Sequence, residues 1–319
     1  MYRPQNKLYP IVAFIILLFI STCCFAANII WDLGGTLIRP STMRTAQSIG
    51  LVNSVMFFFD HGSDASNVLR KNMFKVLSYG DPTPVTRYTP KDPTGIPMPV
   101  PMQQWFKGKL SSQDLLNLAL ERSASYPNYP DEHVRLMVES TFKWMFDPEE
   151  FSRSFKPISS MVKTLEYVAR ERDEEGNPKH KLFILSNFDP ETYKLIYNRH
   201  KNGKIFNKFA PENIFISGMY GTMKPDPAFY RKLIDGANID PKNSIFIDDQ
   251  KENIETAKQL GIDGIWVQDK EYRRVREELK NRGILSGKKR HRHKHKRKKH
   301  KRHHRHKSVQ TIQEPTIYI

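Results

Sequence analysis

Cysteine is nearly absent from this 319-residue chain, and its only two cysteines, Cys23 and Cys24, are adjacent. Two neighbouring cysteines cannot supply a disulfide framework, a CxxC redox site or a multi-cysteine zinc site. Hydrophobic residues nevertheless make up 39% of the chain and aromatic residues 11%. This is enough apolar surface to bury one full core and a sizeable insertion, so the composition excludes wholesale disorder.

A long apolar run is also lacking, because the run at residues 11–27 is shorter than a membrane span. Arg3 and Lys7 precede this run and small residues follow it, which is typical of a secretory signal peptide. We therefore predict a signal peptide over residues 1–26, export of the protein, and no stable membrane span after cleavage. A permanent anchor and a lipoprotein site at Cys23 are the alternatives.

Acidic residues are missing from residues 288–307, which contain 13 Lys or Arg and 7 His. Without those 13 charges the net charge falls from +17 to +4, so the basic character belongs to a tail. We predict that residues 284–319 are disordered, since the run repels itself and has no apolar face. The tail could contact a polyanion such as nucleic acid, anionic lipid or polyphosphate, bind metal through its histidines, or simply aid solubility.

Short apolar segments alternate with helical patterns in the rest of the chain. Buried strands are predicted at residues 28–32, 181–186, 213–217, 244–248 and 264–267, with helices at 159–172, from 226, from 251 and at 270–281. Alternating strands and helices predict an α/β fold with a Rossmann-like parallel sheet covered on both faces. In such a sheet the active site lies at the carboxyl ends of the strands.

Between the first predicted strand and the second, the sequence has helical patterns and no strand pattern. We predict a core formed by residues 27–45 and 155–283, with a mainly helical cap, residues 46–154, inserted between the two parts. Within the cap, residues 81–101 hold 7 of the 21 prolines in the chain. Such a segment cannot form a regular helix, so we expect a surface loop or lid there.

Polar residues follow the predicted strands. They are Asp32, Ser186 with Asn187, and Asp248 with Asp249, while Lys224 lies in a loop after another strand. Phosphoryl transfer needs a nucleophile, a cation and donor groups around the phosphoryl oxygens, and this set contains all three kinds of group. The adjacent carboxylates of Asp248 and Asp249 repel one another unless a positive charge lies near.

Four short motifs occur in an order that resembles the haloacid dehalogenase-like (HAD) superfamily of hydrolases with an insertion cap. They are DLGGTL at residues 32–37, ILSN at 184–187, KPDP at 224–227 and FIDD at 246–249. The resemblance covers residues 28–38 and 157–267, and matches the cap only by position.

The resemblance implies a role for each motif residue. Asp32 would be the nucleophile that forms an aspartyl-phosphate, and Ser186, Asn187 and Lys224 would hold the phosphoryl oxygens. Mg²⁺ would bind to Asp32, the backbone carbonyl of Gly34, Asp248 and Asp249. These roles lead to the expectation of a Mg²⁺-dependent phosphatase acting on a small phosphomonoester.

One residue departs from the pattern of the family. Two positions after the nucleophile, most phosphatases that the chain resembles have a second aspartate that protonates the leaving group, and here the residue is Gly34. General acid–base catalysis typically contributes about 10²–10⁴-fold. Substrates with a good leaving group should therefore be favoured. The alternatives are a dehalogenase in which Asp32 attacks carbon, and a catalytically impaired protein that binds phosphorylated or polyanionic partners.

Overall fold

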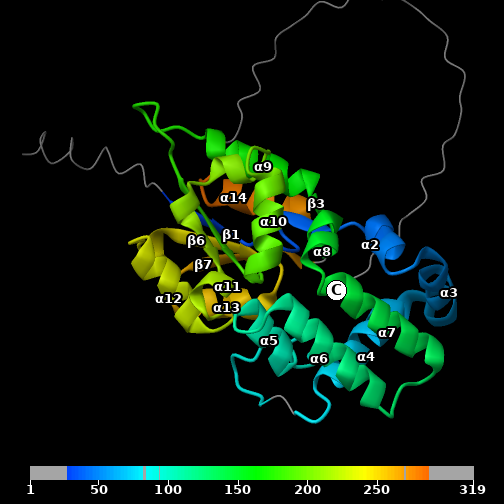
Figure 1. Cartoon of the computed structure of the whole chain (residues 1–319). Coiled ribbons are helices and arrows are strands. Elements are labelled where there is room, and N and C mark those ends of the chain that lie inside the picture. Colours follow the sequence, from blue (N-terminus) through cyan, green and yellow to red (C-terminus); the bar gives the residue numbers. More distant parts are fainter. Residues whose placement is uncertain (1–26, 82–83, 93, 269–270, 287–319) are drawn as a thin grey trace, which may run out of the picture.

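The computed structural model describes residues 27–286 apart from 82–83, 93 and 269–270 (Figure 1). The predicted signal peptide and the predicted basic tail at 288–307 lie outside the described residues. Within the described part of the chain, no helix is both long and apolar enough to cross a membrane.

A five-stranded parallel sheet forms the centre of the core, which confirms the predicted α/β fold with a Rossmann-like sheet. Its order is β5-β4-β1-β6-β7. The strands are β1 (Asn28–Trp31), β4 (Lys181–Ser186), β5 (Ile214–Ile216), β6 (Ser244–Asp248) and β7 (Asp263–Trp266). The chain moves outward from β1 to β5 and then crosses to β6 on the other side. Such a reversal opens a crevice at the carboxyl ends of the central strands.

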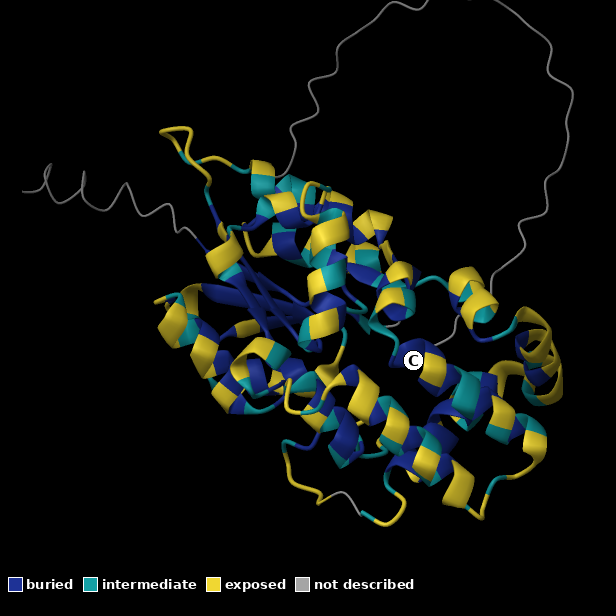
Figure 2. Ribbon diagram, in the orientation of Figure 1, coloured by how far each residue is buried: buried dark blue, intermediate teal, exposed yellow. Residues whose placement is uncertain are grey.

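Helices cover both faces of the sheet, because successive strand residues point to opposite sides. On one face, Ile29 and Trp31 pack in the cluster that includes residues of α9, α10 and α14. On the other face, Ile30 packs with residues of α12 and α13. These helices are α9 (Ser159–Arg170), α10 (Pro190–His200), α12 (Pro227–Gly236), α13 (Lys251–Gln259) and α14 (Tyr272–Asn281). The strands are buried throughout the middle of the core (Figure 2).

The insertion is mainly helical, as predicted, and a two-stranded antiparallel ribbon of β2 (Ile38–Pro40) and β3 (Phe155–Pro157) joins it to the core. Its helices are α2 (Thr42–Ser48), α3 (Leu51–His61), η1 (Gly62–Asp64), α4 (Ala65–Leu77), α5 (Val100–Phe106), α6 (Ser112–Ser125), α7 (Glu132–Met145) and α8 (Pro148–Ser154). The proline-rich segment is a loop up to Pro99. Val100 and Pro101 already belong to α5, since proline is compatible with the first turn of a helix.

The remaining elements of the core are short. They are α11 (Ser217–Tyr220), η2 (Phe206–Lys208), η3 (Pro211–Asn213) and η4 (Pro241–Asn243).

The folded region ends later in the chain than the sequence predicted. At the end of the core, Ile284 and Leu285 are buried, and the backbone carbonyl of Ile284 lies 2.9 Å from His180 Nε2. Residues 284–286 are therefore packed against the core, because two apolar side chains follow the last helix.

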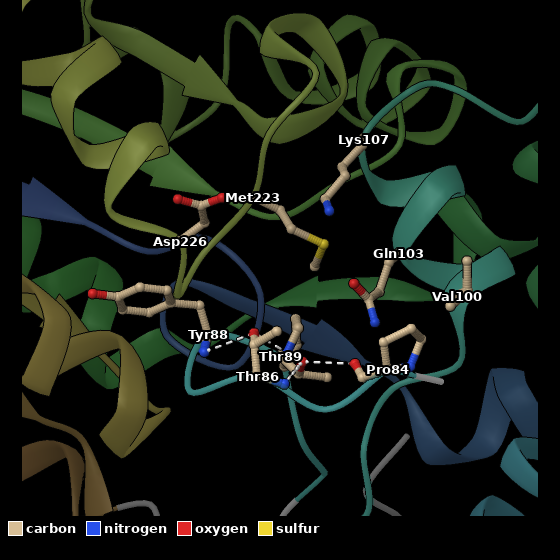
Figure 3. A pocket seen from close by; sticks show the side chains of 10 residues that line it. Pro84, Thr86, Tyr88, Thr89, Val100, Gln103, Lys107, Met223 and Asp226 are labelled. Atoms are coloured by element: carbon tan, nitrogen blue, oxygen red, sulfur yellow. Dashed lines mark hydrogen bonds between the residues drawn. The ribbon is translucent and has the colours of Figure 1, made fainter. Parts of the chain in front are cut away.

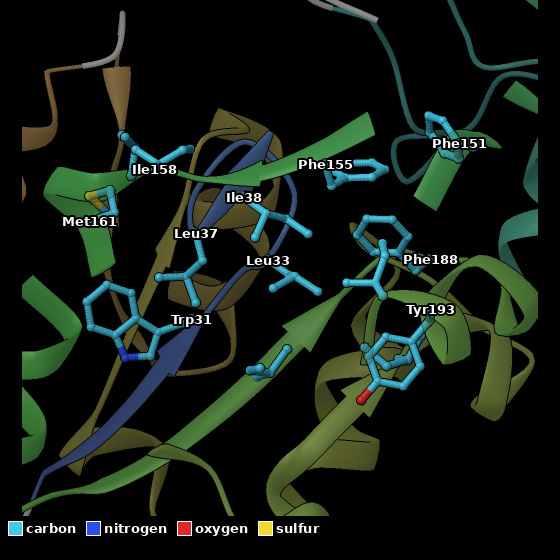
Figure 4. Packing of buried hydrophobic residues seen from close by; sticks show 14 of the residues in the cluster. Trp31, Leu33, Leu37, Ile38, Phe151, Phe155, Ile158, Met161, Phe188 and Tyr193 are labelled. Atoms are coloured by element: carbon cyan, nitrogen blue, oxygen red, sulfur yellow. The ribbon is translucent and has the colours of Figure 1, made fainter. Parts of the chain in front are cut away.

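Apolar packing fixes the loop that follows β1. Leu33 and Leu37 are fully buried beside Ile38 of the connecting ribbon (Figure 4). The ring of Phe155 on β3 packs edge-on against that of Phe188, with the ring centroids 5.5 Å apart. The loop after β1, the connection to the cap and the loop after β4 thus share one hydrophobic cluster.

Candidate active site

Asp32 follows β1 directly, in the middle of the sheet. Its backbone N–H donates to the carbonyl of Ile247 on β6 at 2.9 Å, which continues the strand pairing up to the site. The carboxylate is 6% exposed, and its Oδ1 accepts hydrogen bonds from Ser186 Oγ at 2.9 Å and from Lys224 Nζ at 2.6 Å. The structure therefore brings together Asp32, Ser186 and Lys224, which lie far apart in the sequence.

Lys224 lies between two carboxylates. Its ammonium donates to Asp32 Oδ1 and to Asp248 Oδ2, both at 2.6 Å, and its side chain is only 2% exposed. Burial alone lowers the pKa of Lys224, but the charges of Asp248 and Asp32 outweigh it and raise the pKa above its ordinary value. The site thus contains a permanent buried cation.

Asn187 holds the loop that carries Lys224. Its Oδ1 accepts from the backbone N–H of Lys224 at 2.9 Å, and its Nδ2 donates to the backbone carbonyl of Lys224 at 3.0 Å. The sequence led us to expect direct phosphate binding by Asn187. Its observed contacts position Lys224, because both ends of the amide bind the backbone of that residue, and phosphate binding by Asn187 stays a prediction.

Asp248 is fully buried at the end of β6, and both of its oxygens accept hydrogen bonds. Oδ1 accepts from the backbone N–H of Gln250 at 2.7 Å and from Asn253 Nδ2 at 3.0 Å, and Oδ2 accepts from Lys224. Asn253 lies on α13, and the motif alone did not reveal its contact with Asp248. These bonds hold Asp248 in place as the counter-charge of Lys224.

Asp249 contacts the loop that follows the nucleophile. Gly35 has a φ of +78°, and a Cβ built on it would lie 2.1 Å from Asp249 Oδ2, so only glycine permits this approach. Among the described residues, no side chain donates a hydrogen bond to the carboxylate of Asp249. The pKa of Asp249 is well above its usual range because of burial and the nearby charges of Asp248 and Asp32. An added cation would relieve this unfavourable arrangement.

The pKa of Asp32, the nucleophile candidate, is raised as well. Burial raises the pKa of Asp32 to about 6, with Lys224 opposing the rise and Asp248 adding to it. Three carboxylates and one ammonium therefore meet at the ends of β1 and β6. The excess of negative charge favours binding of a positive ion.

Oxygen atoms at this place fit a hard cation. Asp32 Oδ2 accepts no hydrogen bond from any described residue, and the carboxylate of Asp249 accepts none from a described side chain, so both can supply oxygen ligands. The backbone carbonyl of Gly34 stays a predicted ligand. Mg²⁺ is commonly held by one or two carboxylates and several waters, not by a full protein cage. Among the described residues, no group of three or more His, Cys, Asp or Glu side chains could by itself hold a metal ion. Asp248 is less suited as a ligand because Lys224 occupies its Oδ2.

The surroundings of Gly34, where the second aspartate is missing, are aromatic. A Cβ on Gly34 would meet the ring of Phe188 at 3.5 Å, so an aromatic ring lies beside this position. The site thus combines a carboxylate nucleophile candidate, a hydroxyl, a buried ammonium and a place for a cation.

Comparison with protein families decides the assignment, because the sequence model of haloacid dehalogenase-like hydrolases matches residues 27–261. The chain belongs to the haloacid dehalogenase-like hydrolase family. The match includes all seven of the predicted site residues, which are Asp32, Gly34, Ser186, Asn187, Lys224, Asp248 and Asp249.

Similarity of this HAD-like hydrolase to curated proteins is local. It is 37% identical over 51 residues to flavin mononucleotide hydrolase 1 of Arabidopsis thaliana, which is 21% of that protein. It is 25% identical over 108 residues to drimenol cyclase drtB of Aspergillus calidoustus, 19% of that protein, and 25% identical over 88 residues to sesquiterpene phosphatase astK of Aspergillus oryzae, 42% of it. The chain thus spans about a fifth of the first two relatives and less than half of the third.

Solved structures of HAD family enzymes also resemble this hydrolase. A HAD family enzyme from Bacteroides thetaiotaomicron is 17% identical, with a TM-score of 0.46 over 76% of this chain and 93% of that one. L-2-haloacid dehalogenase from Xanthobacter autotrophicus is 14% identical, with a TM-score of 0.41 over 75% of this chain and 76% of that one.

Proposed function

We propose that this HAD-like hydrolase is a Mg²⁺-dependent phosphatase that acts on a small phosphomonoester through Asp32. The observation that carries the proposal is the pair of hydrogen bonds from Ser186 and Lys224 to a single oxygen of the Asp32 carboxylate. This pair orients the carboxylate and leaves its other oxygen open. It also places a hydroxyl and an ammonium where the oxygens of a phosphoryl group bonded to Asp32 would lie.

The reaction follows from these positions. A carboxylate oxygen of Asp32 attacks phosphorus, and the bond between phosphorus and the leaving oxygen breaks, with the electron pair moving to the leaving group. Lys224 and Ser186 donate hydrogen bonds to the phosphoryl oxygens as negative charge develops on them. Water then attacks the aspartyl-phosphate, which releases phosphate and restores the carboxylate. A bound Mg²⁺ would supply further charge neutralisation beside Asp32 and Asp249.

The substrate is constrained by the glycine at position 34. Without an aspartate there, the leaving oxygen receives no proton from the motif that carries the nucleophile. Leaving groups of low pKa, such as those of aryl, acyl or anomeric phosphates, need this proton least. We therefore expect the best substrates to be phosphates of this kind. The phosphatase and nucleotide-hydrolase names of two curated relatives support the phosphate class of substrate.

The test is phosphate release by the full chain from a panel of aryl, acyl and alkyl phosphates, with Mg²⁺ and with a chelator. Asp32→Asn should abolish turnover, because the amide is not a nucleophile. Asp131→Asn is the matched control. Asp131 caps α7 in the insertion and is not one of the predicted site residues, and asparagine caps helices equally well. Release of halide from a 2-haloacid without metal, and no phosphate release, would favour the dehalogenase. Binding of phosphate without any turnover would favour a catalytically impaired binding protein.

A further inference from the structure

The pocket beside the loop of Lys224 does not include the carboxylates of the proposed metal site. Its volume is about 300 Å³, and its walls come from the proline-rich loop, from α5 and the turn after it, and from the core residues Met223 and Asp226 (Figure 3). Asp32 and Asp249 are not among the residues that line it. The positions of these two carboxylates are therefore set by contacts at the ends of the strands.

Asp249 depends on its backbone for its position more than the other two carboxylates of the site do. Asp32 and Asp248 accept hydrogen bonds from side chains, whereas no side chain of the described residues donates to the carboxylate of Asp249. This carboxylate lies against Gly35, where an added Cβ would be 2.1 Å from Oδ2. In so narrow a space, a small movement of the backbone of Asp249 would displace its carboxylate relative to Asp32.

The indole of Trp266 holds the backbone of Asp249. Trp266 is the last residue of β7, and its partner in the strand register is Asp248 on β6. Its Nε1 donates a hydrogen bond to the backbone carbonyl of Asp249 at 3.0 Å, and among the described residues it is the one donor to that carbonyl. The backbone N–H of Val267 donates to the preceding carbonyl, that of Asp248, at 2.9 Å. The end of β7 thus holds two consecutive carbonyls, the second through a side chain.

Packing keeps this indole in place. Trp266 is partly buried and packs against the hydrophobic cluster that includes Phe246 of β6 and Ile254 of α13. A phenylalanine at this position would keep an apolar ring in the same packing but has no N–H to donate. The hydrogen bond to Asp249 can therefore be removed with a small change in the apolar contacts.

We propose that Trp266 is a positioning residue that sets the geometry of the Mg²⁺ site through the backbone of Asp249. The proposal rests on the proposed phosphatase function, in which Asp249 is a ligand of Mg²⁺. Groups that hold the ligands of a metal orient them, and loss of such a group typically lowers metal affinity about 10–100-fold. Mg²⁺ demands near-ideal octahedral geometry, whereas Ca²⁺ accepts flexible coordination. Loss of the indole N–H should therefore weaken the binding of Mg²⁺ more than that of Ca²⁺.

Calorimetric titration of the full chain with Mg²⁺ and with Ca²⁺ tests the proposal without any substrate. Trp266→Phe should raise the Kd for Mg²⁺ about 10-fold and the Kd for Ca²⁺ by less than about threefold. The Mg²⁺ concentration that gives half-maximal phosphate release should rise by a factor similar to that for the Mg²⁺ Kd. Trp144→Phe is the matched control, because Trp144 is buried on α7 and its Nε1 has no hydrogen-bond partner among the described residues. Its Kd values should equal those of the wild type.

A measurement on the wild type needs no variant of Trp266 to fold. The NMR signal of the Trp266 indole N–H should shift when Mg²⁺ is added, because its acceptor belongs to the proposed ligand Asp249, and the signal of Trp144 should not. A Trp266 signal that stays unchanged while Mg²⁺ binds would overturn the proposal.

The remaining outcomes separate the role of Trp266 from the phosphatase function. An unchanged Kd for Mg²⁺ in Trp266→Phe, or equal losses of affinity for both ions, would overturn the positioning role. Binding of Mg²⁺ that survives in Asp249→Asn would overturn it too, since Asp249 would then not be the ligand. Phosphate release that Asp32→Asn abolishes shows independently of all these results that the phosphatase function holds.

Discussion

Lys224 is the residue on which the charge balance of the site depends. It offers one buried positive charge to Asp32 and Asp248, and the hydrogen bonds from Asn187 fix its backbone. A buried ion pair adds little stability over a well-packed apolar pair, but removal of one partner leaves a buried charge uncompensated. The same side chain is therefore required both for the fold of the site and for its proposed chemistry.

Replacement of this lysine should reduce stability strongly. Lys224→Met is expected to lower the free energy of unfolding by about 3–5 kcal/mol, because it leaves the two carboxylates without their cation. Urea denaturation near pH 8 measures the change. Lys251→Met is the control, since its ammonium is exposed, lies 3.7 Å from Glu255 and should matter by less than about 0.5 kcal/mol. Similar midpoints for both variants would contradict the importance of the buried cation.

Asp189 gives a pH-dependent prediction that does not involve catalysis. It caps α10 by accepting from the backbone N–H of Thr192 at 2.8 Å, and burial raises its pKa from 3.8 to about 6. The folded state therefore binds this proton more tightly than the unfolded state does. The stability that the protonated group contributes is fully present below about pH 4 and is lost as the pH rises through about 6.

Asp189→Asn should remove this dependence while it keeps the helix cap. As the pH rises from about 4.5 to about 8, the free energy of unfolding of the variant should increase by about 2 kcal/mol relative to that of the wild type, because only the wild type loses stability. Urea denaturation at the two pH values gives the difference. Parallel pH profiles for the two proteins would show that Asp189 does not titrate in this range.

At the scale of elements, the turn between α5 and α6 connects the cap to the core. Gly108→Ala should disturb this connection, because the new Cβ would approach the carbonyl oxygen of Gly218 to 2.3 Å at a positive φ. We expect a loss of about 2–4 kcal/mol in unfolding free energy, from overpacking and backbone strain together. Because the cap would then be held less firmly against the core, we expect a higher KM as well.

The control for this variant separates backbone strain from the contact. Gly176 also has a positive φ, +85°, and has no atom within 4 Å of a Cβ built on it. Gly176→Ala should therefore cost only the backbone contribution, about 1–2 kcal/mol, and leave KM unchanged. Equal effects of the two substitutions on stability and KM would show that the contact with Gly218 does not matter. Denaturation and steady-state kinetics on the same preparations provide both measurements.

Local patterns predicted the elements of the core well, because their signals are confined to a few residues. The apolar runs gave β4 and β6 with the observed bounds, and α13 begins at Lys251 as expected. The cap was predicted only as helical. The β2–β3 ribbon escaped prediction because each strand has three residues, and its pairing joins segments more than 100 residues apart.

The same contrast between local patterns and contacts of distant segments applies to the site. Parallel strands bring their carboxyl ends to one edge, so Asp32, Ser186 and Asp248 could be placed together before the structure was known. The docking of the cap against the core through Gly108 and Gly218 could not, because it joins segments more than 100 residues apart.

At the scale of the whole molecule, charge is distributed very unevenly. Of the net charge of +17, 13 charges belong to residues 288–307, so the rest of the chain is close to neutral. The proposed active site, in contrast, has an excess of carboxylates around one buried lysine. Attraction of an anionic polymer by the protein should therefore depend on the tail, and the chemistry at Asp32 should not.

Deletion of residues 287–319 tests this separation. The full chain should bind a labelled single-stranded oligonucleotide with a binding constant whose logarithm falls linearly with the logarithm of the salt concentration, because binding releases counterions. The deletion should abolish this binding and leave phosphate release unchanged. Deletion of residues 308–319 alone is the control, since it removes only 1 of the 34 acidic residues and none of the 51 basic ones.

The histidines of the tail add a second signature to the same measurement. An unperturbed histidine has a pKa of about 6.5, so the 7 histidines of residues 288–307 gain charge as the pH falls through that value. Affinity for the oligonucleotide and the steepness of its salt dependence should both increase between about pH 7.5 and about pH 5.5. A constant salt slope would show that the histidines do not contact the polymer. Binding that persists after removal of the tail would instead place the polyanion site on the folded part of the chain.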